Sequence, residues 1–164
     1  MSETLRDASL LFTTWSQIWS SLVAEDVREQ AWNALGLARP YSECKEEYWN
    51  IFHVGVPMPK VPLLLHAALM REGGAMREDW LRVMHNLDLR WNNEARLPPD
   101  QLGIACEVYA FAIDQGEALL VSELSSRYLL PWCEVAEKKL ADEKNDLVFL
   151  PQAFREDLQS VEIG

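Results

Sequence analysis

Cysteines and long apolar runs are scarce in this chain of 164 residues, and each scarcity excludes a class of protein. The three cysteines, Cys44, Cys106 and Cys133, are odd in number, widely separated and without Cys-x-x-Cys spacing. We therefore predict reduced, buried thiols in a cytoplasmic protein. No apolar run approaches the roughly 20 residues that a membrane span needs. The first residues carry acids and no small-residue cleavage site, so the pattern does not predict a secretory signal.

Basic residues are also few. The chain has 15 lysines and arginines against 26 acidic residues, which gives a formal net charge of −11. An acidic surface repels phosphate backbones, so nucleic acid and anionic membranes are poor partners, and no stable membrane association is expected. The same charge attracts a basic peptide. The simpler interpretation, that acidity only keeps the protein soluble, stays open.

Strand-like alternation is almost absent, whereas apolar residues recur at helical steps of three and four along most of the chain. Helices are predicted over residues 10–22, 25–35, 42–52, 63–70, 75–91, 99–114, 117–139 with a kink at Pro131, and 151–161. No internal repeat or long linker divides the sequence. Residues 1–164 are therefore predicted to form one all-α domain, a bundle of about eight to ten helices.

Residues 53–62, HVGVPMPKVP, interrupt the helical pattern with three prolines and a glycine. Proline fixes φ, lacks an N–H donor and disfavours helix at the residue before it, so this segment is predicted to be an extended loop. The loop is unusually apolar for a solvated connection. It must pack on the protein or wait for a partner.

Residues 96–103, RLPPDQLG, place two prolines, a carboxylate and an amide before the most apolar segment of the chain. Pro98 or Pro99 is predicted to occupy the first helical turn, with Asp100 in the same turn near the positive end of the helix dipole. The segment that follows is apolar all round, which predicts a central helix. Its single charge, Glu107, needs a partner or a water-filled cleft.

Two interpretations of Asp100 and Gln101 remain open on chemistry alone. They are either a device that starts the helix, or polar residues at the rim of a groove. Pro99 would hold that rim rigid in the second case.

The order of these motifs resembles the TorD/DmsD/NarJ family of redox-enzyme maturation chaperones. Pro99-Asp100-Gln101-Leu102, with Glu107 six residues after Gln101, resembles the family's Pro-Asp-His motif and downstream glutamate. The resemblance extends over roughly residues 5–140. It includes the aromatic segment at 47–52, the proline-rich loop at 56–63 and the tryptophan segment at 128–132.

Two departures from the family pattern stand out. Gln101 replaces the family's histidine, and glutamine keeps a donor and an acceptor but carries no charge near neutral pH. The polar and aromatic positions after the proline loop are replaced by Leu64, Leu65, Ala67 and Ala68.

The resemblance implies an all-helical, monomeric cytoplasmic chaperone for a molybdopterin oxidoreductase. Such a protein binds the apo catalytic subunit, often through its twin-arginine signal peptide, and aids cofactor insertion and export proofreading. In this chain the resemblance implies Asp100 and Glu107 as anionic or structural anchors and Gln101 as a polar reader of peptide backbone. The implied groove contacts are Tyr48, Phe52, Pro59, Leu64 and Pro99.

No enzyme is predicted. The histidines at 53, 66 and 85 have no metal-ligand spacing, and no serine, cysteine or lysine lies in a nucleophile motif. We expect no catalytic residue, no metal and no cofactor. Weak GTP binding is implied by resemblance only, since Gly73-Gly74 is more typical of a turn than of a phosphate loop.

The alternative function is a helical peptide-binding adaptor or regulatory module with an unrelated partner. In that case the stripe around Trp15 and Trp19 could be a binding face, although such spacing is more typical of core. Helix exchange through the proline loop could also convert the monomer into a domain-swapped dimer.

Overall fold

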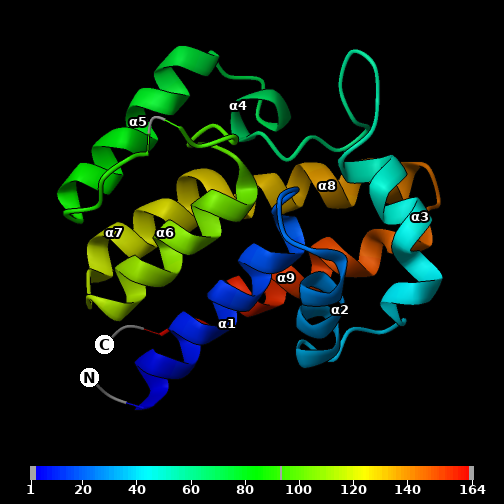
Figure 1. Cartoon of the computed structure of the whole chain (residues 1–164), viewed down its shortest axis with the longest axis horizontal. Helices are drawn as coiled ribbons and strands as arrows, with labels where there is room; N and C mark the ends of the chain where they lie inside the picture. The colour runs from blue at the N-terminus through cyan, green and yellow to red at the C-terminus, as the bar shows by residue number, and fades with distance from the viewer. Residues whose placement is uncertain (1–2, 93, 163–164) are drawn as a thin grey trace.

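The computed structural model describes residues 3–92 and 94–162, and their regular structure is helical (Figure 1). No strand occurs in this part of the chain, where a bridge between Leu64 and Gln101 is isolated. The prediction of an all-α bundle is confirmed. The elements are α1 (Glu3–Trp19), α2 (Glu25–Ala34), α3 (Tyr41–Phe52), α4 (Leu65–Ala68), α5 (Gly73–Asn86), α6 (Leu102–Asp114), α7 (Ala118–Leu124), the π-helix η1 (Ser125–Leu129), α8 (Leu130–Asp142), the 3-10 helix η2 (Asp146–Val148) and α9 (Phe149–Gln159).

The central pair of helices is α1 and α6, which pack side by side (Figure 1). Helix α6 is covered on nearly every side, as its all-round apolar sequence predicts. Its buried residues are Leu102, Gly103, Ala105, Cys106, Val108, Tyr109, Ala110, Ala112 and Ile113.

Large aromatic side chains fill the core between α1, α3, α8 and α9. The rings of Trp15 and Trp19 are stacked 5.9 Å apart, and both residues are fully buried. The ring of Trp19 lies 5.0 Å from that of Trp132 and 5.3 Å from that of Phe52. Such aromatic pairs add specific contacts to their large buried area. The Trp15/Trp19 stripe is therefore core and not an exposed binding face.

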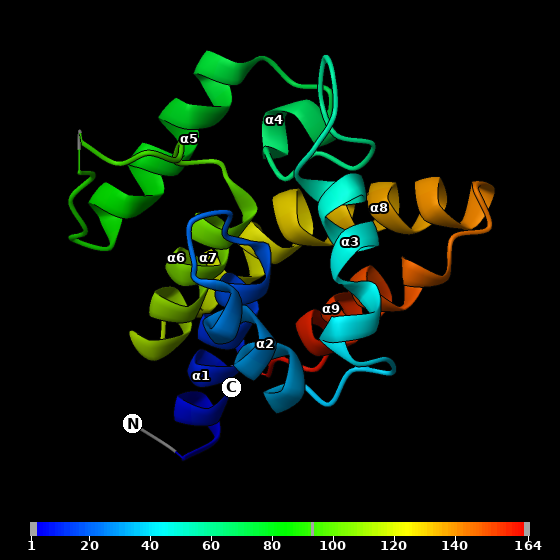
Figure 2. The ribbon, with the colours of Figure 1, turned by 45° about the vertical axis from the view of Figure 1, so that its right-hand side comes forward.

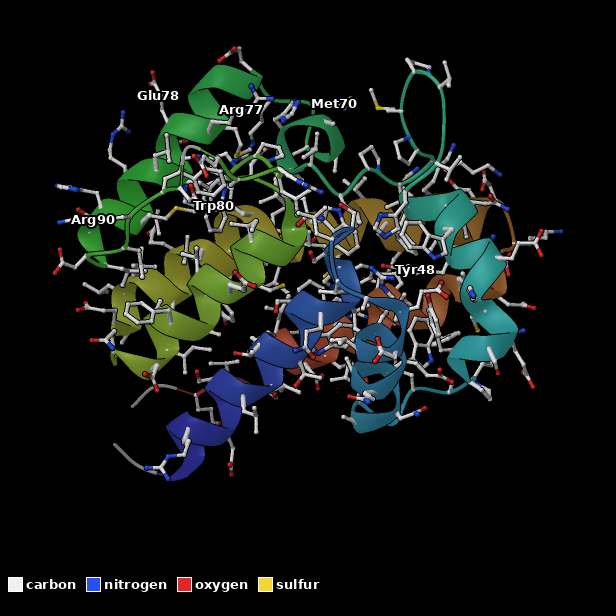
Figure 3. The ribbon with its side chains drawn as sticks, in the orientation of Figure 1. Tyr48, Met70, Arg77, Glu78, Trp80 and Arg90 are labelled. Atoms are coloured by element: carbon white, nitrogen blue, oxygen red, sulfur yellow. The ribbon has the colours of Figure 1, made fainter. Side chains whose placement is uncertain are left out.

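Residues 53–92 and 94–101 form a separate layer, which we call the α4–α5 lobe. The loop after α3, α4 and α5 lie on one side of the bundle in both views (Figures 1 and 2). Trp80 lies between α5 and the helices beneath it (Figure 3). It is fully buried, and its ring centroid is 5.1 Å from that of Tyr128 in η1. This aromatic contact holds α5 to the bundle.

The structure corrects the predicted limits of α5. Gly73 and Gly74, predicted to form a turn, are the first two residues of the helix. The side chain of Glu72 accepts hydrogen bonds from the N–H groups of Gly74 and Ala75, and these bonds satisfy two of the donors that a helix start leaves free. The helix ends at Asn86 and not near residue 91, because Asp88 adopts a positive φ of 61°.

The predicted kink at Pro131 takes the form of a widened turn. The helix of residues 118–142 passes from α7 through the π-helix η1 into α8, with Pro131 in the first turn of α8. Proline lacks a donor and crowds the preceding turn, so the backbone must rearrange just before it. The wider turn at Ser125–Leu129 provides this rearrangement.

The three cysteines are free and buried, as predicted, and burial raises the pKa of each thiol. None of the helices within residues 3–92 and 94–162 is long and apolar enough to cross a membrane.

Candidate functional site

The proline-rich loop and the Pro-Pro-Asp-Gln segment, far apart in sequence, meet at the base of the α4–α5 lobe. The N–H of Leu65 donates to the carbonyl of Asp100 at 3.0 Å, and the N–H of Leu102 donates to the carbonyl of Leu63 at 2.8 Å. These bonds flank the antiparallel bridge between Leu64 and Gln101. The proline-rich loop and the Pro-Pro-Asp-Gln segment are therefore joined by backbone hydrogen bonds.

Asp100 is fully buried, and its carboxylate lies against the start of α4. One oxygen, Oδ2, accepts from the backbone N–H of His66 at 3.0 Å and lies 2.7 Å from Nδ1 of the His66 ring. An ionised carboxylate only accepts hydrogen bonds, so Nδ1 of His66 carries the proton in that state. Asp100 thus caps a helix that lies 34 residues away in the sequence.

The predicted place of Asp100 is corrected by this contact. We expected it in the first turn of α6, but α6 begins at Leu102, so Pro98, Pro99 and Asp100 all precede the helix. The other carboxylate oxygen, Oδ1, has no hydrogen bond, and Nε of Arg77 lies 3.9 Å from it. Arg77 is half exposed, so its charge compensates the buried carboxylate from the surface side.

Gln101, also buried, is the N-cap of α6. Its Oε1 accepts from the N–H groups of Gly103 at 2.7 Å and Ile104 at 3.3 Å, while its Nε2 donates to the carbonyl of Trp19 at 2.7 Å. Both halves of the amide are therefore used within the protein. Gly103 is required here, because an added Cβ would lie 2.8 Å from the backbone nitrogen of Ser20.

The end of α1 is held by further side chains that sequence reasoning missed. Arg28 is fully buried, and its Nη2 donates to the carbonyl of Ser20 at 2.5 Å. Its guanidinium also lies over the ring of Trp49, 4.9 Å from the centroid. The hydroxyl of Tyr48 donates to the carbonyl of Ile18. An arginine in a polar helical segment gives no sequence signal of burial, because such a residue usually lies on the surface.

His53 completes this cluster from the end of α3. Its Nε2 lies 2.8 Å from the hydroxyl of Tyr48. Burial, with the nearby charge of Arg28 as the smaller cause, lowers the pKa of His53 to about 3. The ring is therefore neutral at physiological pH. We call Arg28, Tyr48, Asp100 and Gln101 the buried junction, because they tie α1, α3, α4 and α6 together.

The predicted groove contacts do not form one groove in this structure. Tyr48 and Phe52 are 0% and 1% exposed, so they belong to the core, and a client could reach them only by displacing part of it. Gln101 is 3% exposed and its amide is already bonded within the protein, so in this structure it does not face a surface where a peptide backbone could lie. Pro99 is buried as well, while Pro59 and Leu64 are partly buried.

Three exposed apolar side chains of the lobe lie together in the loop after α3, apart from Met70, which follows α4 and is 91% exposed. Val54, Val56 and Met58 are 58%, 100% and 50% exposed, and we call them the apolar tip. The base of the loop is fixed by two hydrogen bonds: the N–H of Val61 donates to the carbonyl of Ile51, and Nε1 of Trp132 donates to the carbonyl of Pro62. The loop stands away from the bundle beside α4 (Figure 2).

Glu107 lies apart from the buried junction, at a cavity between α5 and α6 that we call the α5–α6 cavity. The cavity has a volume of about 380 Å³. Its walls are mainly apolar and include Met84, Leu89, Trp91, Ile104, Val108 and Phe111. Glu107 remains accessible to solvent, but these walls remove part of its hydration and raise its pKa. The predicted need for a water-filled cleft is met by this cavity.

His66 and Asp100 resemble part of a hydrolytic triad, but within residues 3–92 and 94–162 no hydrogen bond joins His66 to a serine, threonine or cysteine nucleophile. The same residues contain no group of three or more histidines, cysteines or acids that could hold a metal ion. In comparisons with known proteins, no family model, curated protein or solved structure matches the chain.

Proposed function

We propose that this protein is a cytoplasmic chaperone that binds the apo catalytic subunit of a molybdopterin oxidoreductase through its twin-arginine signal peptide. In this role it aids cofactor insertion and proofreads export. The resemblance of the motifs at 47–52, 56–63 and 99–107 supplies the family hypothesis. The observation that carries it is the apolar tip, which projects from a protein of net charge −11.

The apolar tip supports peptide binding because exposed apolar side chains gain free energy when a partner covers them. Val56 is fully exposed and Met58 half exposed. Burial of a valine or methionine side chain contributes roughly 1.5–3 kcal/mol. Methionine also adapts its shape to different partners. Because the base of the loop is bonded to the bundle, little additional ordering is needed on binding.

The charge of the protein supports a basic partner. A twin-arginine signal peptide combines an arginine pair with an apolar stretch, so it complements both the net charge of −11 and the apolar tip. Opposite charges accelerate the encounter of two partners, and this acceleration weakens as salt is added.

Asp100 and Gln101 have a supporting role in this proposal. Gln101 holds the lobe that carries the apolar tip against α1 and α6, Asp100 holds α4 within that lobe, and neither contacts the peptide. The anchoring role of Asp100 is therefore structural, which is one of the two roles that the resemblance implied for it.

The proposal is tested by titrating a fluorescently labelled twin-arginine signal peptide into the protein. The double variant Val56→Ser, Met58→Ser should bind at least about tenfold more weakly, because both apolar contacts are lost. Leu119→Ser is the control, since Leu119 is 86% exposed on α7, which lies on the opposite side of the molecule from the loop that carries the apolar tip (Figure 1). Equal affinity of the tip variant and the control would contradict the proposal.

The client is identified by a tagged pull-down from the source organism grown without oxygen, followed by mass spectrometry. A molybdopterin oxidoreductase subunit, enriched in its cofactor-free form and lost with the tip variant, is the expected result. Recovery of an unrelated protein that depends on the same tip would instead favour the adaptor alternative.

A further inference from the structure

The α5–α6 cavity is a second surface that suits a peptide, and it lies at the opposite end of α5 from α4. Met84 comes from the last turns of α5, Leu89 and Trp91 from the segment that follows, and Ile104 and Phe111 from α6. A cavity of about 380 Å³ accommodates one large side chain and part of its neighbour.

Glu107 gives this cavity its charge. In the part of the chain that the structure describes, no ion pair or hydrogen bond engages its carboxylate, although eleven ion pairs form elsewhere. Arg90 also lines the cavity, but it is exposed at the end of α5 away from α4 (Figure 3). A carboxylate beside apolar walls gains more from an incoming cation than a fully hydrated one does.

An extended segment that runs along α5 connects the cavity with the side of the lobe where α4 lies. Helix α5 has 14 residues and is about 21 Å long. An extended peptide covers about 3.3 Å per residue, so six or seven residues reach from one end of α5 to the other. The loop that carries the apolar tip lies beyond the end of α5 nearest α4, past α4 itself (Figure 1), so the apolar stretch must continue for several more residues to reach it.

We propose that the α5–α6 cavity binds an arginine or lysine side chain of the client peptide, with its cation paired to Glu107 and its methylene groups against Trp91 and Phe111. The apolar stretch of the same peptide then extends along α5 toward the apolar tip. This inference rests on the proposed function and adds to it the direction in which the peptide lies and the residue that recognises its charge.

Other occupants fit the cavity less well. An anionic ligand would meet the carboxylate of Glu107, which repels it. A small neutral apolar molecule would remove water from that carboxylate without replacing the lost hydration. A lysine or arginine side chain pairs its cation with the carboxylate of Glu107 and packs its methylene groups against the apolar walls.

The test is a double-mutant cycle that uses two synthetic peptides, one with an arginine pair before ten apolar residues and one with glutamines in place of the arginines. Glu107→Gln should weaken binding of the arginine peptide about tenfold and leave the glutamine peptide almost unchanged. Glu29→Gln, an exposed acid of α2, is the control for net charge.

Trp91→Ala provides the second measurement, because it removes an apolar wall and keeps Glu107. Trp91→Ala should weaken binding of the arginine peptide about fivefold or more, because the methylene groups of the bound arginine pack on Trp91. Circular dichroism establishes that each variant is folded. If the arginine peptide binds Glu107→Gln and Glu29→Gln equally well, the cavity assignment is wrong while the proposed function stands. If neither peptide binds the wild-type protein, the proposed function fails as well.

Discussion

The buried junction and the α5–α6 cavity use polar side chains in opposite ways. At the junction, the amide of Gln101 donates to α1 and accepts from α6, and one carboxylate oxygen of Asp100 accepts from α4. At the cavity, Glu107 remains accessible and faces apolar walls. The first arrangement stabilises the fold, whereas the second leaves a charge free for a partner. Substitutions in the two regions should therefore separate stability from binding.

The largest effect is expected from Arg28→Ala in the buried junction. The change removes a hydrogen bond to the carbonyl of Ser20 and the packing on the rings of Tyr48 and Trp49. The free energy of unfolding should fall by about 3 kcal/mol, as measured by urea denaturation. A loss below about 1 kcal/mol would show that the end of α1 does not depend on this guanidinium.

Gln101→Ala should destabilise the protein by about 2 kcal/mol, because α6 loses its cap and the carbonyl of Trp19 loses its donor. Gln30→Ala, at an exposed position of α2, should change stability by less than about 0.5 kcal/mol. Peptide affinity of the folded fraction should be unchanged in both variants. A selective loss of affinity in Gln101→Ala would restore Gln101 as a client contact and remove the distinction between the two regions.

The smallest effect concerns the pH dependence of stability at Glu107. Its raised pKa means that the folded state binds the proton more tightly than the unfolded state does. This contribution is present below the unfolded pKa and is lost as pH rises through the folded pKa. Glu107→Gln should reduce the change in the free energy of unfolding between pH 4 and 7 by less than about 1 kcal/mol, as measured by urea denaturation. An unchanged curve would mean that the cavity does not dehydrate the carboxylate.

The central helix and its environment could be predicted from the sequence because apolar residues on every side of a helix leave no stable alternative to burial. The start of α6 could not. Proline is favoured in a first helical turn, and that preference predicts Pro98 or Pro99 in the first turn of the helix, with Asp100 beside it. In the structure, the backbone of this segment pairs with Leu63 and Leu65 instead. A tertiary contact prevailed over a local preference.

The polar residues of the candidate site were harder to place than the apolar ones. Asp100 and Gln101 were identified from their motif, but their exposure was not determined by it, because the same residue types cap helices and bind ligands. Glu107 was recognised as the charge that needed a cleft. The walls of that cleft come from α5 and the segment after it, and no local pattern links those residues to α6.

The sequence by itself determined the all-α class, the central position of α6 and the burial of the thiols, since helical periodicity and apolar content act locally along the chain. Only the tertiary structure decided which polar side chains are used within the protein and which stay free. That choice depends on which helix ends meet. At the end of α1, carbonyls without a partner in the helix accept from Arg28, Tyr48 and Gln101. The helix end that lines the cavity of Glu107 is the C-terminal end of α5, which presents further carbonyl acceptors to a carboxylate and not donors.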